Sequence, residues 1–260
     1  MVVKELKNLL SFLTIFPVTM DKDMLNDCAK GMWFFPLIGA FIGLLAGLFG
    51  WAAGLVLPSV VVGGLVLALL LLITGLHHTD GLLDFGDGVM VHGTAEHKIE
   101  VMHDQLTGAG GLTLGIMTIL ITVLAIGQLQ SNVTLVGFRI PLLFFGIILV
   151  ELSAKLSMVV MAWAGKSAHA GMNSPFLEAM HGGKGNLRLL AALVISLAIA
   201  VPLLHWAGLF VVIAAVVTSL VMVAVAQKNF NGVTGDVFGA TNEITRMVCL
   251  IVLLAVVAWA

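Results

Sequence analysis

Long continuous runs of apolar residues alternate along the chain with short polar stretches. Each run is about twenty residues long, the length of an α-helix that crosses the hydrocarbon core of a bilayer. The runs lack the alternating apolar and polar positions of a membrane β-strand. The pattern predicts seven transmembrane helices, which are Met32–Leu57, Ser59–Leu76, Gly111–Gln128, Ile140–Ala164, Leu187–Leu204, Trp206–Ala226 and Ile244–Trp259.

The first apolar stretch, Leu6–Val18, is shorter than these runs, and charged residues follow it. No small-residue cleavage pattern follows it either, so a signal peptide is disfavoured. An amphipathic helix at the membrane interface, beside Lys4 and Lys7, fits better. The predicted fold class is therefore all-α: a polytopic helical membrane protein with about seven transmembrane helices and an N-terminal interfacial helix. We expect a single domain over residues 1–260, because no linker or internal repeat interrupts the pattern.

Composition supports this class, because 60% of the residues are hydrophobic and only 10% are charged. A soluble domain would carry about 25% charged residues. The net charge of −2 gives no global basic field that would attract nucleic acid. We therefore expect the protein to interact with the lipid bilayer and not with nucleic acid.

Polar residues gather in four segments, 1–31, 77–110, 165–186 and 227–243. With seven spans, all four lie on the side of the N-terminus. Every Lys and Arg except Arg139 and Lys155 is there or at an adjoining helix end. The positive-inside rule then predicts a cell-membrane protein whose N-terminus and polar site face the cytoplasm. All acids except Glu151 share that side, and topology does not explain this excess.

Two features lie inside the predicted spans. Glu151 and Lys155 are four residues apart, so they share a helix face and can neutralise each other, as a structural pair or at the edge of a polar site. Gly39, Gly43 and Gly47 form a double GxxxG face for close helix packing. That face fits packing within the bundle better than packing between chains, which leaves a homo-oligomer as the alternative.

The densest polar stretch, His77–Gly88, contains Asp80, Asp84 and Asp87 at positions i, i+4 and i+7. On a helix these carboxylates project from one face and repel one another unless a cation neutralises them. Such oxygen ligands suit Mg²⁺ or Mn²⁺ better than zinc. Asp104 could supply a fourth carboxylate. The alternative, a solvated cap at the end of the second span, is disfavoured because acids at a helix C-terminus oppose its dipole.

A second polar constellation, Asn231–Glu243, places Asp236 and Glu243 seven residues apart on one helix face. Its glycines let backbone or phosphate come close. Together the two constellations predict a polar cleft that holds a divalent metal, as phosphoryl transfer requires. The chain has no GxxxxGK[ST] motif and no HExxH motif, which excludes a Walker-type ATPase and a zinc protease of that kind.

These residues resemble the cobalamin synthase family, the adenosylcobinamide-GDP ribazoletransferases. The family's His-x-Asp-Gly-Leu-x-Asp-x-x-Asp-Gly pattern matches His78–Gly88, and its Gly-x-Thr-Gly-Asp-x-x-Gly-Ala-x-x-Glu pattern matches Gly232–Glu243. A Met-x-Asp segment matches Met102–Asp104. The resemblance spans nearly the whole chain, and the paired histidines with the Asp84–Asp87 spacing look more like the archaeal branch.

The resemblance implies that the protein joins adenosylcobinamide-GDP to α-ribazole, or to its 5′-phosphate, with release of GMP, which gives adenosylcobalamin or its 5′-phosphate. It implies Mg²⁺ on the diphosphate. The expected metal ligands are Asp80, Asp84, Asp87 and Asp104. The expected catalytic residues are Asp104, His78, Asp236 and Glu243, and the expected substrate-binding residues are Thr234, Gly235, Asn242, Gly81 and Gly108.

One departure from the family pattern stands out. Many members carry Asp-Ser-Arg where this chain has Asp104 followed by Gln105 and Leu106. Lys98 or Arg246 would have to replace the missing arginine, unless that phosphate contact is dispensable.

Three rival functions remain weaker. A CDP-alcohol phosphatidyltransferase would need an Ala-Arg pair after Gly88, and Val89–His92 lacks it. A divalent-cation transporter normally keeps polar residues along the whole pathway, but here the acids lie on one side. A purely structural membrane subunit would not explain the acidic cluster.

Overall fold

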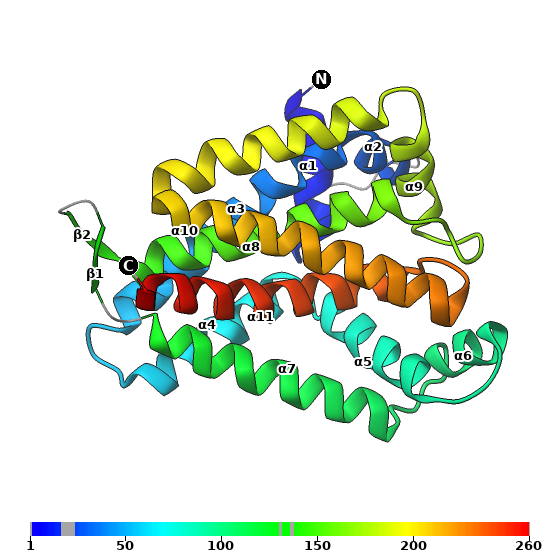
Figure 1. The fold of residues 1–260 in the computed structure, drawn as a ribbon, viewed down its shortest axis with the longest axis horizontal. Coiled ribbons are helices and arrows are strands. Elements are labelled where there is room, and N and C mark those ends of the chain that lie inside the picture. Colours follow the sequence, from blue (N-terminus) through cyan, green and yellow to red (C-terminus); the bar gives the residue numbers. More distant parts are fainter. Residues whose placement is uncertain (1, 17–23, 130–131, 136–137, 260) are drawn as a thin grey trace.

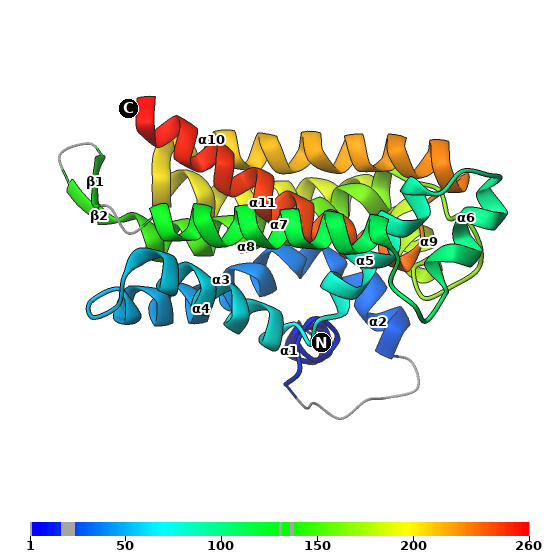
Figure 2. The same ribbon diagram turned by 90° about the horizontal axis from the view of Figure 1, so that it is seen from below.

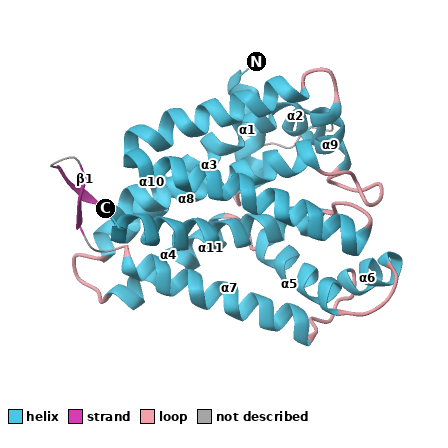
Figure 3. Ribbon diagram, viewed as in Figure 1, coloured by secondary structure: helices cyan, strands magenta, loops and turns pink. Residues whose placement is uncertain are grey.

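The structure is a computed structural model that describes residues 2–16, 24–129, 132–135 and 138–259. Over these residues the chain is helical except for loops and one antiparallel hairpin of β1 (Asn132–Leu135) and β2 (Phe138–Pro141) (Figures 1 and 3). This confirms the all-α class. The helices are α1 (Val2–Leu13), α2 (Met24–Gly31), η1 (Met32–Phe34), α3 (Phe35–Ala53), α4 (Ser59–Ile73), α5 (His77–Met90), α6 (Ala95–Met102), α7 (Ala109–Gln128), α8 (Leu142–Ala164), α9 (Ser174–His181), α10 (Gly185–Phe230) and α11 (Gly235–Trp259).

Five helical segments in the described ranges are long and apolar enough to cross a membrane: Met24–Ala53, α7, α8, α10 and α11. A sixth arises if α4 and α5, which meet at 96°, form one broken span. The chain is therefore a multi-span membrane protein, and the number seven stays a prediction. The backbone of α10 leaves helical geometry at Leu204 and His205, where the sequence predicts a boundary between two spans. Figure 1 shows the two arms of α10 running in opposite directions.

The helix α8 lies at the centre of the bundle and packs against α3, α10 and α11. The GxxxG face of α3 makes this contact. A Cβ on Gly43 would lie 2.6 Å from the Cα of Ile148, and one on Gly47 would lie 2.7 Å from the carbonyl oxygen of Phe144. The predicted use of these glycines for packing within the chain is confirmed, because only a residue without a Cβ allows the two backbones to approach so closely.

The polar segments gather at one end of the bundle. Figures 1 and 2 place α2, α5, α6 and α9 at the end opposite the β1–β2 hairpin and the C-terminus. This is the arrangement that the alternating loops predict, and the cytoplasmic placement of this end stays a prediction. The single-domain expectation likewise stays a prediction.

The N-terminal helix begins and ends earlier than expected. It covers Val2–Leu13 instead of Leu6–Val18, and residues 17 and 18 lie outside the described residues. Leu9 and Leu13 are buried, while Lys7 on the opposite side is exposed. The helix is therefore amphipathic, as predicted, and its contact with a membrane interface stays a prediction.

Candidate active site

The acidic cluster lies mainly on α5, which is a separate helix and not the C-terminal end of the second span. The residue before it, Leu76, has a φ of 63°, and this left-handed turn lets the chain leave α4 and start α5. Asp80 is in the first turn of α5, where the helix dipole favours an acid. The acids were expected at a helix C-terminus, where the dipole would oppose them, and for Asp80 this expectation was wrong.

The first residue group brought together is Asp80, Asp84, Asp87 and Asp236. Asp84 is partly buried, and the negative charges of the other three act on it at Coulombic range. Asp236 belongs to the first turn of α11 and reaches the cluster because α5 packs against α11. No Lys, Arg or His in the described part of the chain forms a salt bridge with these four carboxylates. The group is therefore an uncompensated negative patch built from two helices.

Two glycines allow this approach of α5 to α11. A Cβ on Gly81 would lie 2.8 Å from the carbonyl oxygen of Asp236, and one on Gly239 would lie 3.0 Å from the carbonyl oxygen of His78. Gly81 was predicted to contact substrate. The structure places it in the helix contact, where its missing side chain sets how close Asp236 comes to Asp80 and Asp84.

Asp87 connects the cluster to the start of α7. Its Oδ2 accepts a hydrogen bond from the backbone N–H of Gly108 at 2.7 Å, and its Oδ1 accepts one from Gly111 at 2.8 Å. These N–H groups belong to the first turn of the helix, where they lack helical partners. Asp87 and Gly108, predicted as a metal ligand and a substrate contact, thus hold the loop before α7 in place.

Asp104 lies in this loop, after α6, and is exposed to solvent. Its Oδ1 accepts a hydrogen bond from the N–H of Leu106 at 3.1 Å. The neighbouring ring of His103 packs edge-on against His169, with ring centroids 5.8 Å apart. Asp104 therefore lies next to the contact between its loop and the 165–173 loop. Its carboxylate accepts a hydrogen bond from the backbone two residues further along the chain.

The segment before α11 is fixed by hydrogen bonds at both of its sides. The N–H of Val233 donates to the carbonyl of Lys166 at 2.7 Å, which joins this segment to the loop after α8. Thr234 is buried, and its Oγ1 accepts from the N–H of Val237 and donates to Asp236 Oδ2, both at 3.3 Å. Gly235 is exposed and begins the helix. Thr234 thus caps α11 and orients the Asp236 carboxylate.

A buried charge network connects α8 and α11 behind the cluster. The Arg246 guanidinium donates to both Glu151 and Glu243, including an Nη2–Oε2 bond of 3.2 Å to Glu151. Lys155 Nζ donates to Asn242 Oδ1 at 2.5 Å, and Asn242 Nδ2 donates to Glu243 Oε1 at 3.0 Å. Each of these residues is buried. The predicted site residues Glu243 and Asn242 are therefore buried and hydrogen-bonded to other side chains. Glu151 forms an ion pair with Arg246 of the neighbouring helix α11.

His78 is on α5, two residues before Asp80. It is only 8% exposed, and its Nδ1 has no hydrogen-bond partner in the described residues. The charges of Lys155 and Arg246 act on it from the network. His78 is thus a predicted catalytic residue whose ring lies within electrostatic reach of the buried network.

The donor chemistry of the cluster fits a hard divalent cation, because several carboxylates lie together without a positive partner. The described residues nevertheless contain no group of three or more His, Cys, Asp or Glu side chains already arranged around one point as metal ligands. The four-aspartate ligand set therefore stays a prediction.

The two cations suggested as substitutes for the missing arginine are both occupied. Lys98 Nζ donates to Asn229 Oδ1 at 2.8 Å, and Arg246 is held in the buried network. Instead, a cavity of about 620 Å³ lies beside the loop joined to Val233, and Lys166, His169 and His181 line it. The polar residues of segment 165–186 could bind anionic groups, but their loose spacing follows no helical or loop motif, so the sequence alone assigned them no role.

The fold and the site define a class, a multi-span helical membrane protein with a carboxylate cluster at one end of its bundle. Residues 5–254 match the family model described as Cobalamin-5-phosphate synthase (CobS), and the chain belongs to this family.

Several curated relatives carry the name adenosylcobinamide-GDP ribazoletransferase. The protein from Methanosarcina mazei is 31% identical over 251 residues, which cover 93% of this chain and 88% of the relative. The proteins from Thermococcus kodakarensis and Thermococcus onnurineus are 33% and 34% identical and cover 98% and 95% of this chain, and 99% and 96% of their own lengths. These relatives are archaeal, as the motif spacing led us to expect. No solved structure matches.

Proposed function

We propose that this chain is an adenosylcobinamide-GDP ribazoletransferase. The observation that carries the proposal is the position of the family motif residues: Asp80, Asp84 and Asp236 come from segments about 150 residues apart in the sequence and meet as one negative patch. A role in holding the fold together does not explain such a patch, because like charges repel one another. A site that binds a diphosphate substrate together with a metal ion explains it.

The reaction is a substitution at phosphorus. The ribose hydroxyl oxygen of α-ribazole, or of its 5′-phosphate, bonds to the phosphorus next to cobinamide. The bond from that phosphorus to the bridging oxygen breaks, and GMP leaves with that oxygen and its electron pair. The hydroxyl proton passes to a carboxylate of the cluster. We assign Asp236 to orient the hydroxyl, because Thr234 fixes its carboxylate.

Negative carboxylates alone would repel a diphosphate, so the proposal includes Mg²⁺, or Mn²⁺ in its place, held by Asp80 and Asp84 with help from Asp236. When bound, the ion would offset the charge that develops on the phosphate oxygens. Asp87, on α5, would keep its hydrogen bonds to the backbone at the start of α7. The residues of the buried network would hold α11 in place against α8. His78 would contact the phosphate or take up a proton through its unpartnered Nδ1.

We assign the nucleotide end of the substrate to the cavity lined by Lys166, His169 and His181. Charge-assisted hydrogen bonds from these groups would bind phosphate in place of the missing arginine. The cavity adjoins the loop that is bonded to Val233, two residues before α11 begins, so it lies on the same end of the bundle as Asp236. We further propose a cell-membrane location with this end in the cytoplasm, which the distribution of Lys and Arg supports.

The test is GMP release from adenosylcobinamide-GDP on addition of α-ribazole to the purified protein. We expect activity with Mg²⁺, none with EDTA, and recovery when Mg²⁺ is restored. Asp80→Asn and Asp84→Asn should each lower turnover about 10²-fold or more. Glu100→Gln, which neutralises an exposed acid of α6, is the matched control and should keep full activity. Full turnover in EDTA or in either aspartate variant would contradict the proposal.

A further inference from the structure

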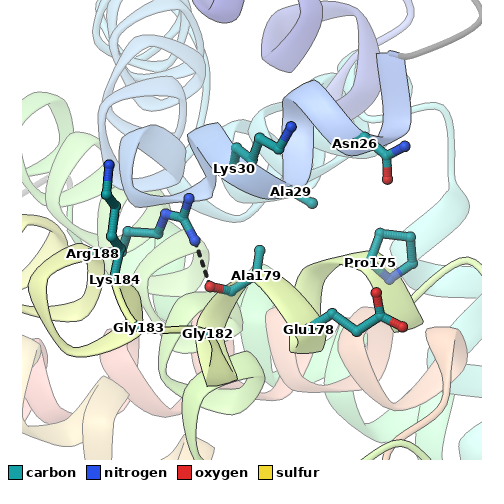
Figure 4. A pocket seen from close by; sticks show the side chains of 10 residues that line it. All are labelled: Asn26, Ala29, Lys30, Pro175, Glu178, Ala179, Gly182, Gly183, Lys184 and Arg188. Carbon is teal, nitrogen blue, oxygen red and sulfur yellow. Dashed lines mark hydrogen bonds between the residues drawn. The ribbon is translucent and has the colours of Figure 1, made fainter.

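A second cavity, which shares the lining residues Glu178 and Gly182 with the first, lies between α2, α9 and the start of α10 and has a volume of about 350 Å³ (Figure 4). Lys30 from α2, together with Lys184 and Arg188 from the start of α10, lines it. Glu178 is the one acid among the lining residues. The cavity thus carries an excess of positive charge drawn from two separate segments, and nothing in the proposed reaction uses it.

The geometry of the start of α10 adds to this charge. Lys184 precedes the first helical residue, so the positive end of the helix dipole faces the cavity. Arg188 Nη1 donates to the carbonyl of Ala179 at 2.5 Å, which fixes the guanidinium against α9 (Figure 4). Fixed donors and a helix N-terminus are the usual elements of a phosphate site.

An exposed apolar stripe begins one turn further along α10. Leu187, Leu190 and Val194 are 65%, 57% and 56% exposed, and their spacing of three and four residues places them on one helix face. In a membrane protein such a face contacts acyl chains.

An aromatic residue marks the level of the membrane surface at the same place. Trp163 at the end of α8 is partly exposed, and its Nε1 donates to Asn186 Oδ1 at 2.8 Å. Tryptophan is enriched where the hydrocarbon core meets the headgroups, because its ring is apolar and its N–H is polar. The cavity therefore lies at headgroup level and the stripe at acyl-chain level.

From this juxtaposition we propose that the protein binds an anionic phospholipid, with the headgroup phosphate in the cavity of Lys30, Lys184 and Arg188 and the acyl chains along Leu187, Leu190 and Val194. A soluble phosphate would need only the cavity. The exposed apolar stripe that begins at the same end of α10 favours the lipid. This inference is independent of the proposed transferase activity.

The experiment uses the full-length protein, purified in detergent and freed of lipid. Bound lipid is counted by native mass spectrometry, and thermal unfolding is followed, with phosphatidylglycerol or phosphatidylcholine added. We expect phosphatidylglycerol to bind more tightly than phosphatidylcholine and to raise the unfolding temperature more. The ratio of the two affinities should fall about fivefold in each of the variants Lys30→Gln and Lys184→Gln. Lys228→Gln, an exposed lysine at the far end of α10, should keep the preference.

Three results would overturn the inference. Equal binding of the two lipids is the first, and an unchanged preference in the Lys30→Gln/Lys184→Gln double variant is the second. The third is full reproduction of the thermal shift by inorganic phosphate or glycerol 3-phosphate, which would identify a soluble anion as the ligand. If a lysine variant unfolds, Leu190→Gln tests the acyl-chain half and should lower retention of phosphatidylglycerol.

Discussion

The substitution Gly81→Ala tests whether the contact between α5 and α11 sets the geometry of the active site. The new Cβ would lie 2.8 Å from the carbonyl oxygen and 2.9 Å from the Cα of Asp236, both backbone atoms that no side-chain rotation can move away. Ordinary contact begins near 3.4 Å, so the helices must separate by roughly 0.6 Å, the difference between 3.4 and 2.8. The carboxylate of Asp236 would then move away from Asp80 and Asp84.

A misplacement of about 1 Å can cost 10²-fold in rate, so we expect turnover to fall at least about tenfold. The overpacked contact should also lower the free energy of unfolding by about 1–3 kcal/mol. GMP release and thermal unfolding in detergent measure the two effects. Gly64→Ala in α4 is the matched control, because a Cβ there meets nothing within 4 Å. Wild-type turnover in a folded Gly81→Ala protein would refute the idea that this helix contact positions the site.

Two further predictions concern the buried network and the large cavity. Arg246→Leu leaves Glu151 and Glu243 buried without their cation, so the free energy of unfolding should fall by about 3–5 kcal/mol. Arg246→Lys keeps a positive charge and should lose less. Equal stability of Arg246→Leu and the wild type in a denaturation series would argue against the network. Lys166→Gln removes one charged donor from the cavity and should raise the KM for adenosylcobinamide-GDP about tenfold while leaving that for α-ribazole unchanged. An equal change in both KM values would place Lys166 outside the nucleotide site.

The sequence predicted the features that depend on local spacing. Asp80, Asp84 and Asp87 share a helix face, as their separation of four and three residues requires. The GxxxG face of α3 packs within the chain for the reason the motif suggested. The break in α10 likewise falls where the apolar run is interrupted around His205.

The rest depended on contacts between segments far apart in the chain. Spacing indicated Glu151 with Lys155, but Arg246, 95 residues away, takes Glu151 because two helices pack side by side. The role of Gly81 as a contact with Asp236 cannot be read from either motif alone. Asp104 was grouped with the metal ligands by order in the sequence, and the turn after α6 directs its carboxylate to its own backbone.

The pairing of opposite charges within the buried network bears on how the chain enters the bilayer. Inserting one charged side chain at mid-membrane costs about 2.5–3.5 kcal/mol. Within α8, Glu151 and Lys155 carry opposite charges four residues apart, and within α11 the same holds for Glu243 and Arg246 at three. Each pair is electrically neutral on its own helix, so neither helix needs the other to offset its charge during synthesis. When the two helices dock, Arg246 keeps Glu243 and gains Glu151, and this added ion pair joins the end of the chain to its middle.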